Sequence, residues 1–306
     1  MLEITNASAM HLYETQTAQP QTQPAQPQLQ TQTEQKAPKV QTNIRYFPYT
    51  LSEVDEITNA LTLWFEALPH VPSCDGLLDL YRGLSGRERL IQSDLSAKYI
   101  HWSSALGYRM ARPRDALSCT ILSDGFKKFI SEEDCVIVMP SWDRVKNRVI
   151  GVTARSVFSK SFRKFTPLPY VPHGFLMSGR LKREKAYFDA WIVVESAFDS
   201  DWLRTIYPYV IASSGVSGLN TEAFTLVCET SSSLIVAFDN DEAGEDGYRN
   251  MLDRARYLRN KPVMKRFNSP YKKDFGDIAQ LALTDKRLYG IYRDMVLKSI
   301  ELMTLC

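Results

Sequence analysis

Three acidic residues follow short apolar runs in the second half of the chain. Glu195 comes directly after the run 191–194, and Asp239 and Asp241 follow the run 234–238. Oxygen ligands without a nearby histidine or cysteine suit a hard cation such as magnesium. One or two such ions can bridge phosphate oxygens and stabilise the attacking and leaving oxygens of a nucleotidyl transfer. The residue types therefore indicate a divalent-cation site that works on phosphates.

The apolar runs before these acids belong to an alternating pattern of strands and helices. Continuous apolar runs are typical of parallel strands that are buried on both faces. The pattern predicts two further strands and three helices, at residues 209–212, 263–267, 197–207, 219–230 and 242–260. Such alternation gives a parallel sheet whose functional residues lie at the carboxyl ends of its strands. We therefore expect an α/β fold with a four-stranded parallel sheet flanked by helices. The three carboxylates then share one crevice, where like charges are unfavourable without a cation.

Other kinds of protein also carry an Asp-x-Asp pair. A calcium-binding EF-hand loop is excluded, because Ala243 and Asn250 stand where that loop needs ligands. A haloacid-dehalogenase-like phosphatase usually has Thr or Val at the position of Ala243, and it leaves Glu195 without a role. A solvated helix N-terminus explains Glu242 and Glu245, since acids there meet the helix dipole favourably. It does not explain an acid at the end of a neighbouring strand.

The segment between Asp143 and Lys185 is strongly basic. Only Asp143 and Glu184 oppose its basic residues, which are Arg144, Lys146, Arg148, Arg155, Lys160, Arg163, Lys164, Arg180, Lys182, Arg183 and Lys185. Aromatic residues are interleaved with them, at Phe158, Phe162, Phe165 and Tyr170. Positive charge attracts phosphates and aromatic rings stack on bases, so the composition suits single-stranded nucleic acid or nucleotides. It is equally typical of a solvated basic face over a small β core.

Composition narrows the class of protein further. The chain has 306 residues, 44% of them hydrophobic, and a formal net charge of only +2, so any basic surface is local. Its five cysteines form no CxxC pair, which argues against a zinc site or a disulfide framework. No apolar run approaches the roughly 18 residues that span a bilayer, and the first ten residues do not resemble a secretory signal. We expect a soluble, cytoplasmic protein without zinc.

Three motifs resemble the TOPRIM domain of bacterial- and phage-type DNA primases. They are Val193-Val194-Glu195-Ser196-Ala197-Phe198-Asp199, Phe238-Asp239-Asn240-Asp241-Glu242-Ala243-Gly244 and Lys273-Asp274-Phe275-Gly276-Asp277. Upstream, residues 138–155 resemble the primase segment in which a strand ending in proline leads through a polar turn to a Gly-x-x-x-Arg strand. The resemblance covers about 135–283. It departs at Ser196, where the family has glycine, and at 166–169, where the family has Asn-Ser-Pro.

The resemblance implies a role for each candidate residue. Asp239 and Asp241 would bind magnesium (or manganese), with Glu195 as a further ligand or as the group that organises the initiating 3′-hydroxyl. Asp199 and Asp274 are second candidates for the metal or its water, and a helix cap is an equal alternative for Asp199. The residues expected to contact template or nucleotide are Arg155, Arg163, Lys164 and Lys273. A structural ion pair is an equal alternative for Lys273, and Asp277 is expected to cap the helix 278–283.

The implied function is that of a primase catalytic core, a DNA-directed RNA polymerase that makes short RNA primers by nucleotidyl transfer. Its partners would be single-stranded DNA, ribonucleoside triphosphates and no membrane. Because no zinc module and no Gly-x-x-x-x-Gly-Lys-Ser/Thr loop is found, we also expect a replicative helicase and a separate template-recognition protein. The short chain without a zinc module resembles compact phage primases. A phage source would place the protein in the host cytoplasm. The alternatives are a TOPRIM-type nuclease and a non-catalytic nucleic-acid-binding accessory protein.

These patterns divide the chain into five parts. Residues 1–43 are rich in Gln, Thr and Pro and hold too little apolar surface to fold, so they are expected to be a disordered tail. The other parts are a helical region (44–134), a basic α/β subdomain (135–187), the TOPRIM domain (188–283) and a C-terminal helix (284–306).

Overall fold

The computed structural model describes residues 51–143, 147–168, 188–213, 219 and 221–305. The chain divides into two units, 1–43 and 44–306. The tail predicted for 1–43 lies outside the described residues, as do the basic residues at 144, 146, 180, 182, 183 and 185. All of the described residues therefore belong to the second unit.

The first half of this unit contains an antiparallel sheet in the order β1-β2-β3-β4. Its strands are β1 (Arg109–Ala111), β2 (Val136–Asp143), β3 (Arg148–Ser156) and β4 (Phe162–Phe165). The helices of this half are α1 (Leu51–Ala67), α2 (Cys74–Leu80), α3 (Ser85–Ile91), α4 (Asp94–Leu106), α5 (Pro113–Leu117) and α6 (Asp124–Glu133). The region predicted to be helical thus also contributes a strand, β1.

Strand β2 runs through Pro140, where the sequence pattern predicted its end. A proline cannot donate to the sheet ladder, so it needs a position without a partner on its N–H side. Among the described residues, β1 pairs with β2 only as far as Val138, and β3 pairs with β2 beyond that point. Pro140 therefore lies beyond the part of β2 that is paired with β1.

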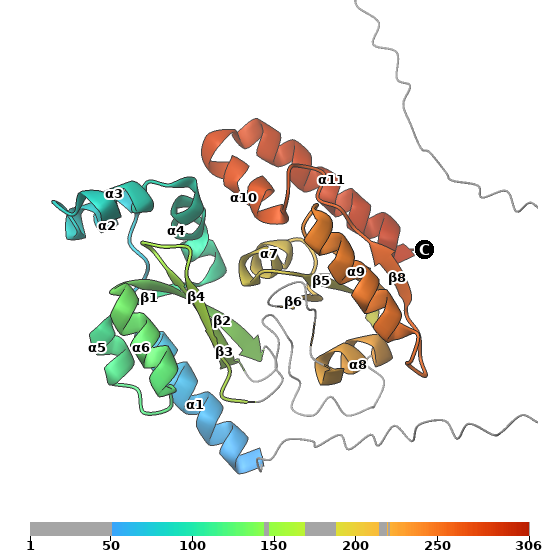
Figure 1. Ribbon diagram of the computed structural model, residues 1–306, viewed down its shortest axis with the longest axis horizontal. Coiled ribbons are helices and arrows are strands. Elements are labelled where there is room, and N and C mark those ends of the chain that lie inside the picture. The colour runs from blue at the N-terminus through green and yellow to red at the C-terminus, as the bar shows by residue number, and fades with distance from the viewer. Residues whose placement is uncertain (1–50, 144–146, 169–187, 214–218, 220, 306) are drawn as a thin grey trace, which may run out of the picture. The chain divides into compact units, whose positions relative to one another are not determined.

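The two faces of this sheet pack against different elements. Val138 and Val152 face a core formed with α1, α5 and α6, which lie together on that side in Figure 1. Ile137 and Met139 face the other way, into a core that also contains Tyr99 of α4. The alternation follows from the twofold period of a strand.

The second half is a four-stranded parallel sheet, as predicted, and its strands lie in the order β6-β5-β7-β8. Its strands are β5 (Phe188–Val194), β6 (Val210–Ala212), β7 (Ser231–Val236) and β8 (Val263–Arg266). Its helices are α7 (Ala197–Leu203), α8 (Thr221–Glu229), α9 (Glu242–Ala255), α10 (Phe275–Thr284) and α11 (Lys286–Leu305). None of the described helices is both long enough and apolar enough to cross a bilayer.

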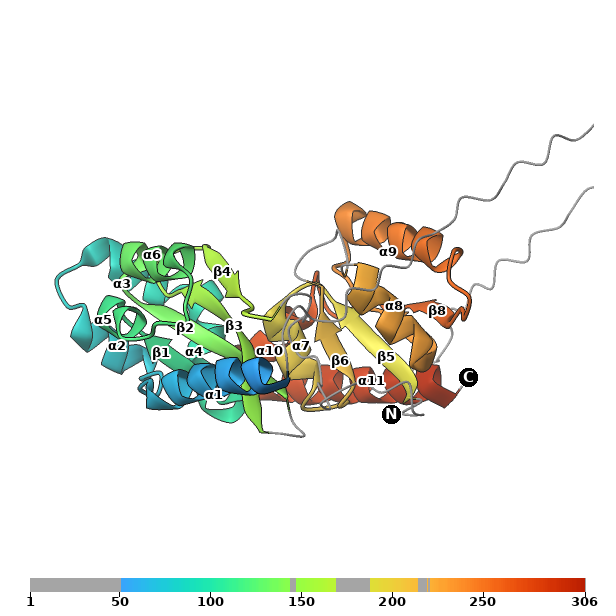
Figure 2. The ribbon, with the colours of Figure 1, turned by 90° about the horizontal axis from the view of Figure 1, so that it is seen from below.

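Helices cover both faces of the parallel sheet, which explains why its strands are apolar throughout. Phe224 of α8 and Met251 of α9 pack with Val193 and Val236 on one face. Trp202 of α7 and Val296 of α11 belong to the core on the opposite face. Figure 2 shows α8 and α9 on one side of the sheet and α7, α10 and α11 on the other.

The second of these cores is shared with the antiparallel sheet. Ile137 and Met139 of β2 belong to the same buried cluster as Ile192 and Val194 of β5, and Ile100 of α4 joins them. Helix α4 therefore contributes to a core that is shared by the parallel sheet and the antiparallel sheet, which is named the basic sheet after Arg155, Arg163 and Lys164 on β3 and β4.

Candidate functional site

The predicted acids lie at the carboxyl ends of two neighbouring strands. β5 and β7 are paired up to Val193 and Val236, and the backbone N–H of Ala237 continues the ladder by donating to the Val193 carbonyl at 2.8 Å. Just beyond, the backbone N–H of Asp239 donates to Oε1 of Glu195 at 3.1 Å. The Glu195 carboxylate thus contacts the Asp-x-Asp segment directly.

The Asp-x-Asp segment is fixed by the start of α9. Asp241 is the N-cap of this helix, and its Oδ1 accepts a hydrogen bond from the backbone N–H of Gly244 at 2.9 Å. A Cβ atom at Gly244 would collide with the Asp239 carbonyl oxygen and would lie only 3.0 Å from the carbonyl carbon. The glycine of this motif is therefore required by a close backbone approach.

A second loop brings Lys273 to the two aspartates. The Asn240 side chain donates to the carbonyls of Ser269 and Lys272, at 2.8 and 2.9 Å. The Asn240 N–H donates to the Lys273 carbonyl at 2.8 Å. As a result the Lys273 ammonium lies 3.2 Å from Oδ2 of Asp239 and 2.9 Å from Oδ2 of Asp241.

Arg266, at the end of β8, is a site residue that the sequence analysis missed. Its guanidinium donates to the carbonyls of Phe238 at 2.9 Å and Asp239 at 2.8 Å, and it also bonds the carbonyl of Val236. It therefore holds the turn that presents Asp239. The available signal was a charged residue at the end of a predicted strand, next to the acidic strand ends.

Burial and the neighbouring charges shift the pKa values of the three acids. Burial, followed by the charge of Asp239, raises the pKa of Glu195, and burial also raises the pKa of Asp239. The exposed Asp241 behaves differently, since the hydrogen bond from Lys273 lowers its pKa. The same bonds raise the pKa of Lys273. The Lys273 ammonium thus supplies positive charge to a cluster that needs it.

The three acids suit a hard divalent cation, because every candidate ligand atom is a carboxylate oxygen. Two of these oxygens already contact one positive charge, the Lys273 ammonium. Within the described part of the chain, no three acidic, histidine or cysteine side chains are gathered closely enough to form a metal-binding group. Glu195 is instead turned to the Asp239 backbone. A divalent ion at this position would therefore replace the Lys273 ammonium.

Asp199 is more deeply buried than these three acids, and the half-buried Asp274 lies beside it. Asp199 is only 5% exposed, and its Oδ2 accepts a hydrogen bond from the Ser196 hydroxyl at 2.8 Å. Burial, and then the charge of Asp274, raises the pKa of Asp199 to about 7. The cap prediction for Asp199 is wrong, because Ser196 is the N-cap of α7. This capping role also accounts for serine at the motif's usual glycine position.

The prediction for Asp277 is also wrong. Asp274 is the N-cap of α10, and its Oδ1 accepts from the Asp277 N–H at 2.7 Å. Asp277 completes a capping box, and its carboxylate accepts from the Lys273 N–H at 3.0 Å. An Asp-x-x-Asp spacing suits this arrangement, since the cap and the third helical residue bond reciprocally.

The basic residues predicted to contact nucleic acid are divided between two faces of the antiparallel sheet. Arg155 and Lys164 are on one face, because Lys164 pairs with Thr153 and alternate residues share a face. Arg163 pairs with Ala154 and belongs to the opposite face. The Arg155 guanidinium lies 4.5 Å from the centre of the Tyr99 ring, and burial lowers the pKa of Lys164.

The interleaved aromatic residues are divided in the same way. Phe158 and Phe165 are buried in two hydrophobic cores, so they are packing residues. Phe162 is 57% exposed and lies opposite Arg155 in the β3–β4 ladder, which leaves its ring free to stack on a base. Tyr170 lies outside the described residues.

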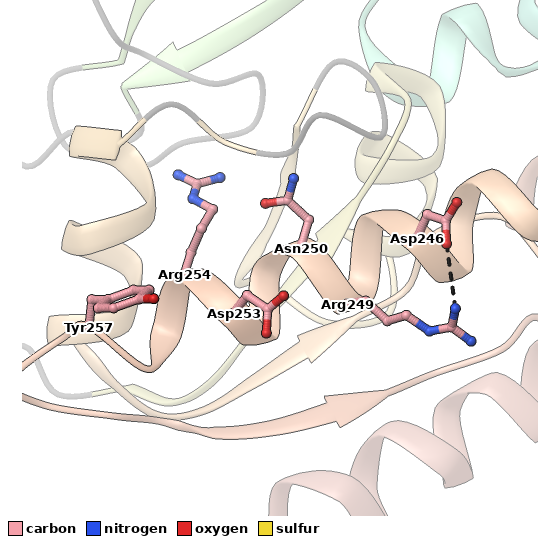
Figure 3. Close-up of a pocket in the computed structure, with 6 residues that line it drawn as sticks. All are labelled: Asp246, Arg249, Asn250, Asp253, Arg254 and Tyr257. Atoms are coloured by element: carbon pink, nitrogen blue, oxygen red, sulfur yellow. Dashed lines mark ion pairs between the residues drawn. The ribbon is translucent and has the colours of Figure 1, made fainter.

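An open hollow on the outer face of α9 lies among different residues. They are Asp246, Arg249, Asn250, Asp253, Arg254 and Tyr257 (Figure 3). Arg249 pairs with Asp246 and Glu245 of its own helix, at 3.6 Å each. Such pairs are typical of a solvated helix face. None of the acids that follow the strands contributes to it.

Comparison with known proteins agrees with the motifs. Residues 192–279 match the family model described as Toprim-like. This segment, with its acids at the ends of parallel strands, is therefore a Toprim-like domain, as the sequence predicted. No curated protein matches the chain.

The chain is similar to several solved structures. The DnaG catalytic core is 16% identical over 79% of this chain and 79% of its own, with a TM-score of 0.46. The RNA polymerase domain of Mycobacterium tuberculosis primase DnaG is 16% identical over 77% of this chain and 82% of its own, with a TM-score of 0.47. A DNA primase domain from Pseudomonas aeruginosa is 15% identical over 74% of this chain and 78% of its own, with a TM-score of 0.44.

Proposed function

We propose that this chain is the catalytic core of a DNA primase, which makes short RNA primers on single-stranded DNA by magnesium-dependent nucleotidyl transfer. The observation that carries the proposal is the Toprim-like domain with Glu195, Asp239 and Asp241 at neighbouring strand ends. A basic sheet joined to the same core supplies a surface of the opposite charge. Acids alone suit many metal enzymes, but acids beside a basic, aromatic face suit a polynucleotide substrate.

In this proposal Asp239 and Asp241 hold magnesium (or manganese), and Glu195 turns from the Asp239 N–H to complete the ligands or to orient the 3′-hydroxyl. The bound ion supplies positive charge to the phosphate oxygens during transfer. Lys273 is the residue that must move, because its ammonium lies between both aspartates. Its flexible side chain then carries a positive charge to the triphosphate of the incoming nucleotide. Arg266 keeps the Asp239 backbone fixed throughout.

On the basic sheet, Arg155 and Lys164 share the face that packs with α4 and are proposed to contact template or nucleotide phosphates. Phe162 is an exposed ring for stacking on the same face. Arg163 is on the opposite face, so it is proposed to bind a strand that passes along the edge near β4. We also propose a helicase and a template-recognition protein as partners of this chain.

Incubation of the protein with single-stranded DNA, ribonucleotides and magnesium tests this proposal. Short RNA products are expected from the natural chain and none from Asp239→Ala. Asp253→Ala is the matched control, because Asp253 is an exposed acid on the outer face of α9, and its RNA yield should be unchanged. Shortened DNA would identify a nuclease instead, and binding without turnover would identify an accessory protein. RNA synthesis by Asp239→Ala would overturn the site assignment.

A further inference from the structure

Lys98 of α4 is a buried lysine that the proposed reaction does not use. It is 8% exposed. Within the described part of the chain its ammonium forms no hydrogen bond and no ion pair. The rings of Phe198 and Tyr99 also lie near it, with their centres 5.2 and 5.7 Å from Nζ. A lysine is rarely buried to this degree unless nearby negative charge compensates for the lost hydration.

The negative charge comes from Asp199 and Asp274. A Cβ atom at position 276 would lie 2.5 Å from Nζ of Lys98 and 3.0 Å from Oδ1 of both aspartates. Three charged atoms thus surround one small space that only a glycine leaves open. The ammonium faces both carboxylates at once rather than closing an ion pair with one of them. Burial lowers the pKa of Lys98, but Tyr99, Asp199 and Asp274 outweigh burial, so the lysine stays charged.

The position of Lys98 is fixed by the rest of α4. The Trp102 indole N–H donates to the Ala279 carbonyl of α10 at 3.0 Å. The Tyr108 hydroxyl, just after the helix, donates to Oδ2 of Asp201 in α7 at 2.8 Å. Helix α4 is thereby bonded to the two helices that carry Asp199 and Asp274. These hydrogen bonds fix the backbone that carries Lys98, so its ammonium is held beside Asp199 and Asp274.

We propose that the Lys98 ammonium is the resident cation of the Asp199–Asp274 pair and takes the place of a second divalent ion. Two neighbouring carboxylates, of which Asp199 is buried and Asp274 half-buried, require a positive charge nearby. A divalent ion and an ammonium compete for the same small space and repel each other. The chain therefore binds one divalent ion, at Asp239 and Asp241, and Asp199 and Asp274 act as positioning residues. The single ion rests on the proposed function, whereas the lysine's role at the second pair does not.

Counting bound Mn²⁺ by the electron spin resonance of the free ion tests this inference on the full chain at pH 8. We expect one Mn²⁺ on the natural protein and one on Asp199→Asn, while Asp239→Asn loses it. Lys98→Met keeps an unbranched side chain of nearly the same length and removes its charge, so this variant should gain a second Mn²⁺. Lys98→Arg keeps the charge and should still bind one.

Two outcomes would overturn the inference. The first is a natural chain that binds two Mn²⁺ and loses one in Asp199→Asn. The second is a Lys98→Met protein, folded by circular dichroism, that still binds only one. If Lys98→Met does not fold, the comparison of the natural chain with Asp199→Asn decides alone. The count does not depend on RNA synthesis, so a chain without polymerase activity can still show the predicted metal stoichiometry.

Discussion

At the scale of single residues, the acidic site is already balanced by the chain's own cation. Lys273 contacts both Asp239 and Asp241, so it competes with any divalent ion for the same oxygens. The Lys273 ammonium thus offsets the repulsion between the two carboxylates. The lysine therefore has two opposing effects, because it weakens metal binding and supplies charge to the substrate.

Substitution of Lys273 by methionine separates these two effects. Loss of the competing ammonium should tighten Mn²⁺ binding about threefold to tenfold, since partly exposed ion pairs are worth about 0.2–1 kcal/mol each. RNA synthesis should nevertheless fall, because the triphosphate loses a positive partner. Isothermal titration with Mn²⁺ and a primer assay measure the two quantities. Lys286→Met, at the exposed start of α11, is the control and should change neither. Weaker Mn²⁺ binding by Lys273→Met would contradict this account.

At the scale of helices and strands, the close approach at the start of α9 sets the geometry of the site. Gly244→Ala places a methyl group against the Asp239 carbonyl, and backbone atoms cannot move aside as a flexible side chain does. We expect Mn²⁺ binding to be lost or greatly weakened, with a fall of about 1–3 kcal/mol in the free energy of unfolding. Metal titration and urea unfolding measure these effects.

Gly290→Ala is the matched control for this substitution. Gly290 lies in α11, and a Cβ there would meet no atom within 4 Å. In a helix interior, alanine is more favourable than glycine by roughly 0.5–1 kcal/mol. This variant should therefore be slightly more stable and should bind Mn²⁺ normally. Equal Mn²⁺ affinities for the two variants would refute the proposed close-packing requirement at Gly244.

The same scale explains what the sequence could predict. Buried parallel strands and amphipathic helices have strong local signals, so the order of elements in the Toprim-like domain and the strand-end position of Glu195 and Asp239 followed from pattern alone. Lys98 had no such signal, and Arg266 had only its place at the end of a predicted strand. Lys98 meets Asp199 across about a hundred residues of chain, and only the packing of α4 on α7 and α10 brings them together. Likewise β1 is too short to produce a readable alternation, and the sequence does not show that the pairing of β1 with β2 ends before Pro140.

At the scale of the whole folded unit, α4 packs in a core that the basic sheet shares with the Toprim-like domain. Tyr99 illustrates this, because its ring contacts both Arg155 of β3 and Phe198 of α7. Lys98 adds a charge to the same junction. The acid pair that it faces therefore links the stability of the fold to pH.

Asp199 makes this link measurable. Its pKa is raised from 3.8 to about 7 by burial and by Asp274, so the folded chain holds the proton more tightly than the unfolded chain does. That contribution to stability is fully present below pH 3.8 and is lost as the pH rises through about 7. Asp199→Asn cannot ionise, so its free energy of unfolding should fall less between pH 5 and pH 8, by roughly 1–3 kcal/mol. Urea unfolding at both pH values measures the difference, with Asp253→Asn as the exposed control. The same fall in the natural chain and in Asp199→Asn would show that this carboxyl group does not keep a proton in the folded state, and that Lys98 alone balances the pair throughout this range.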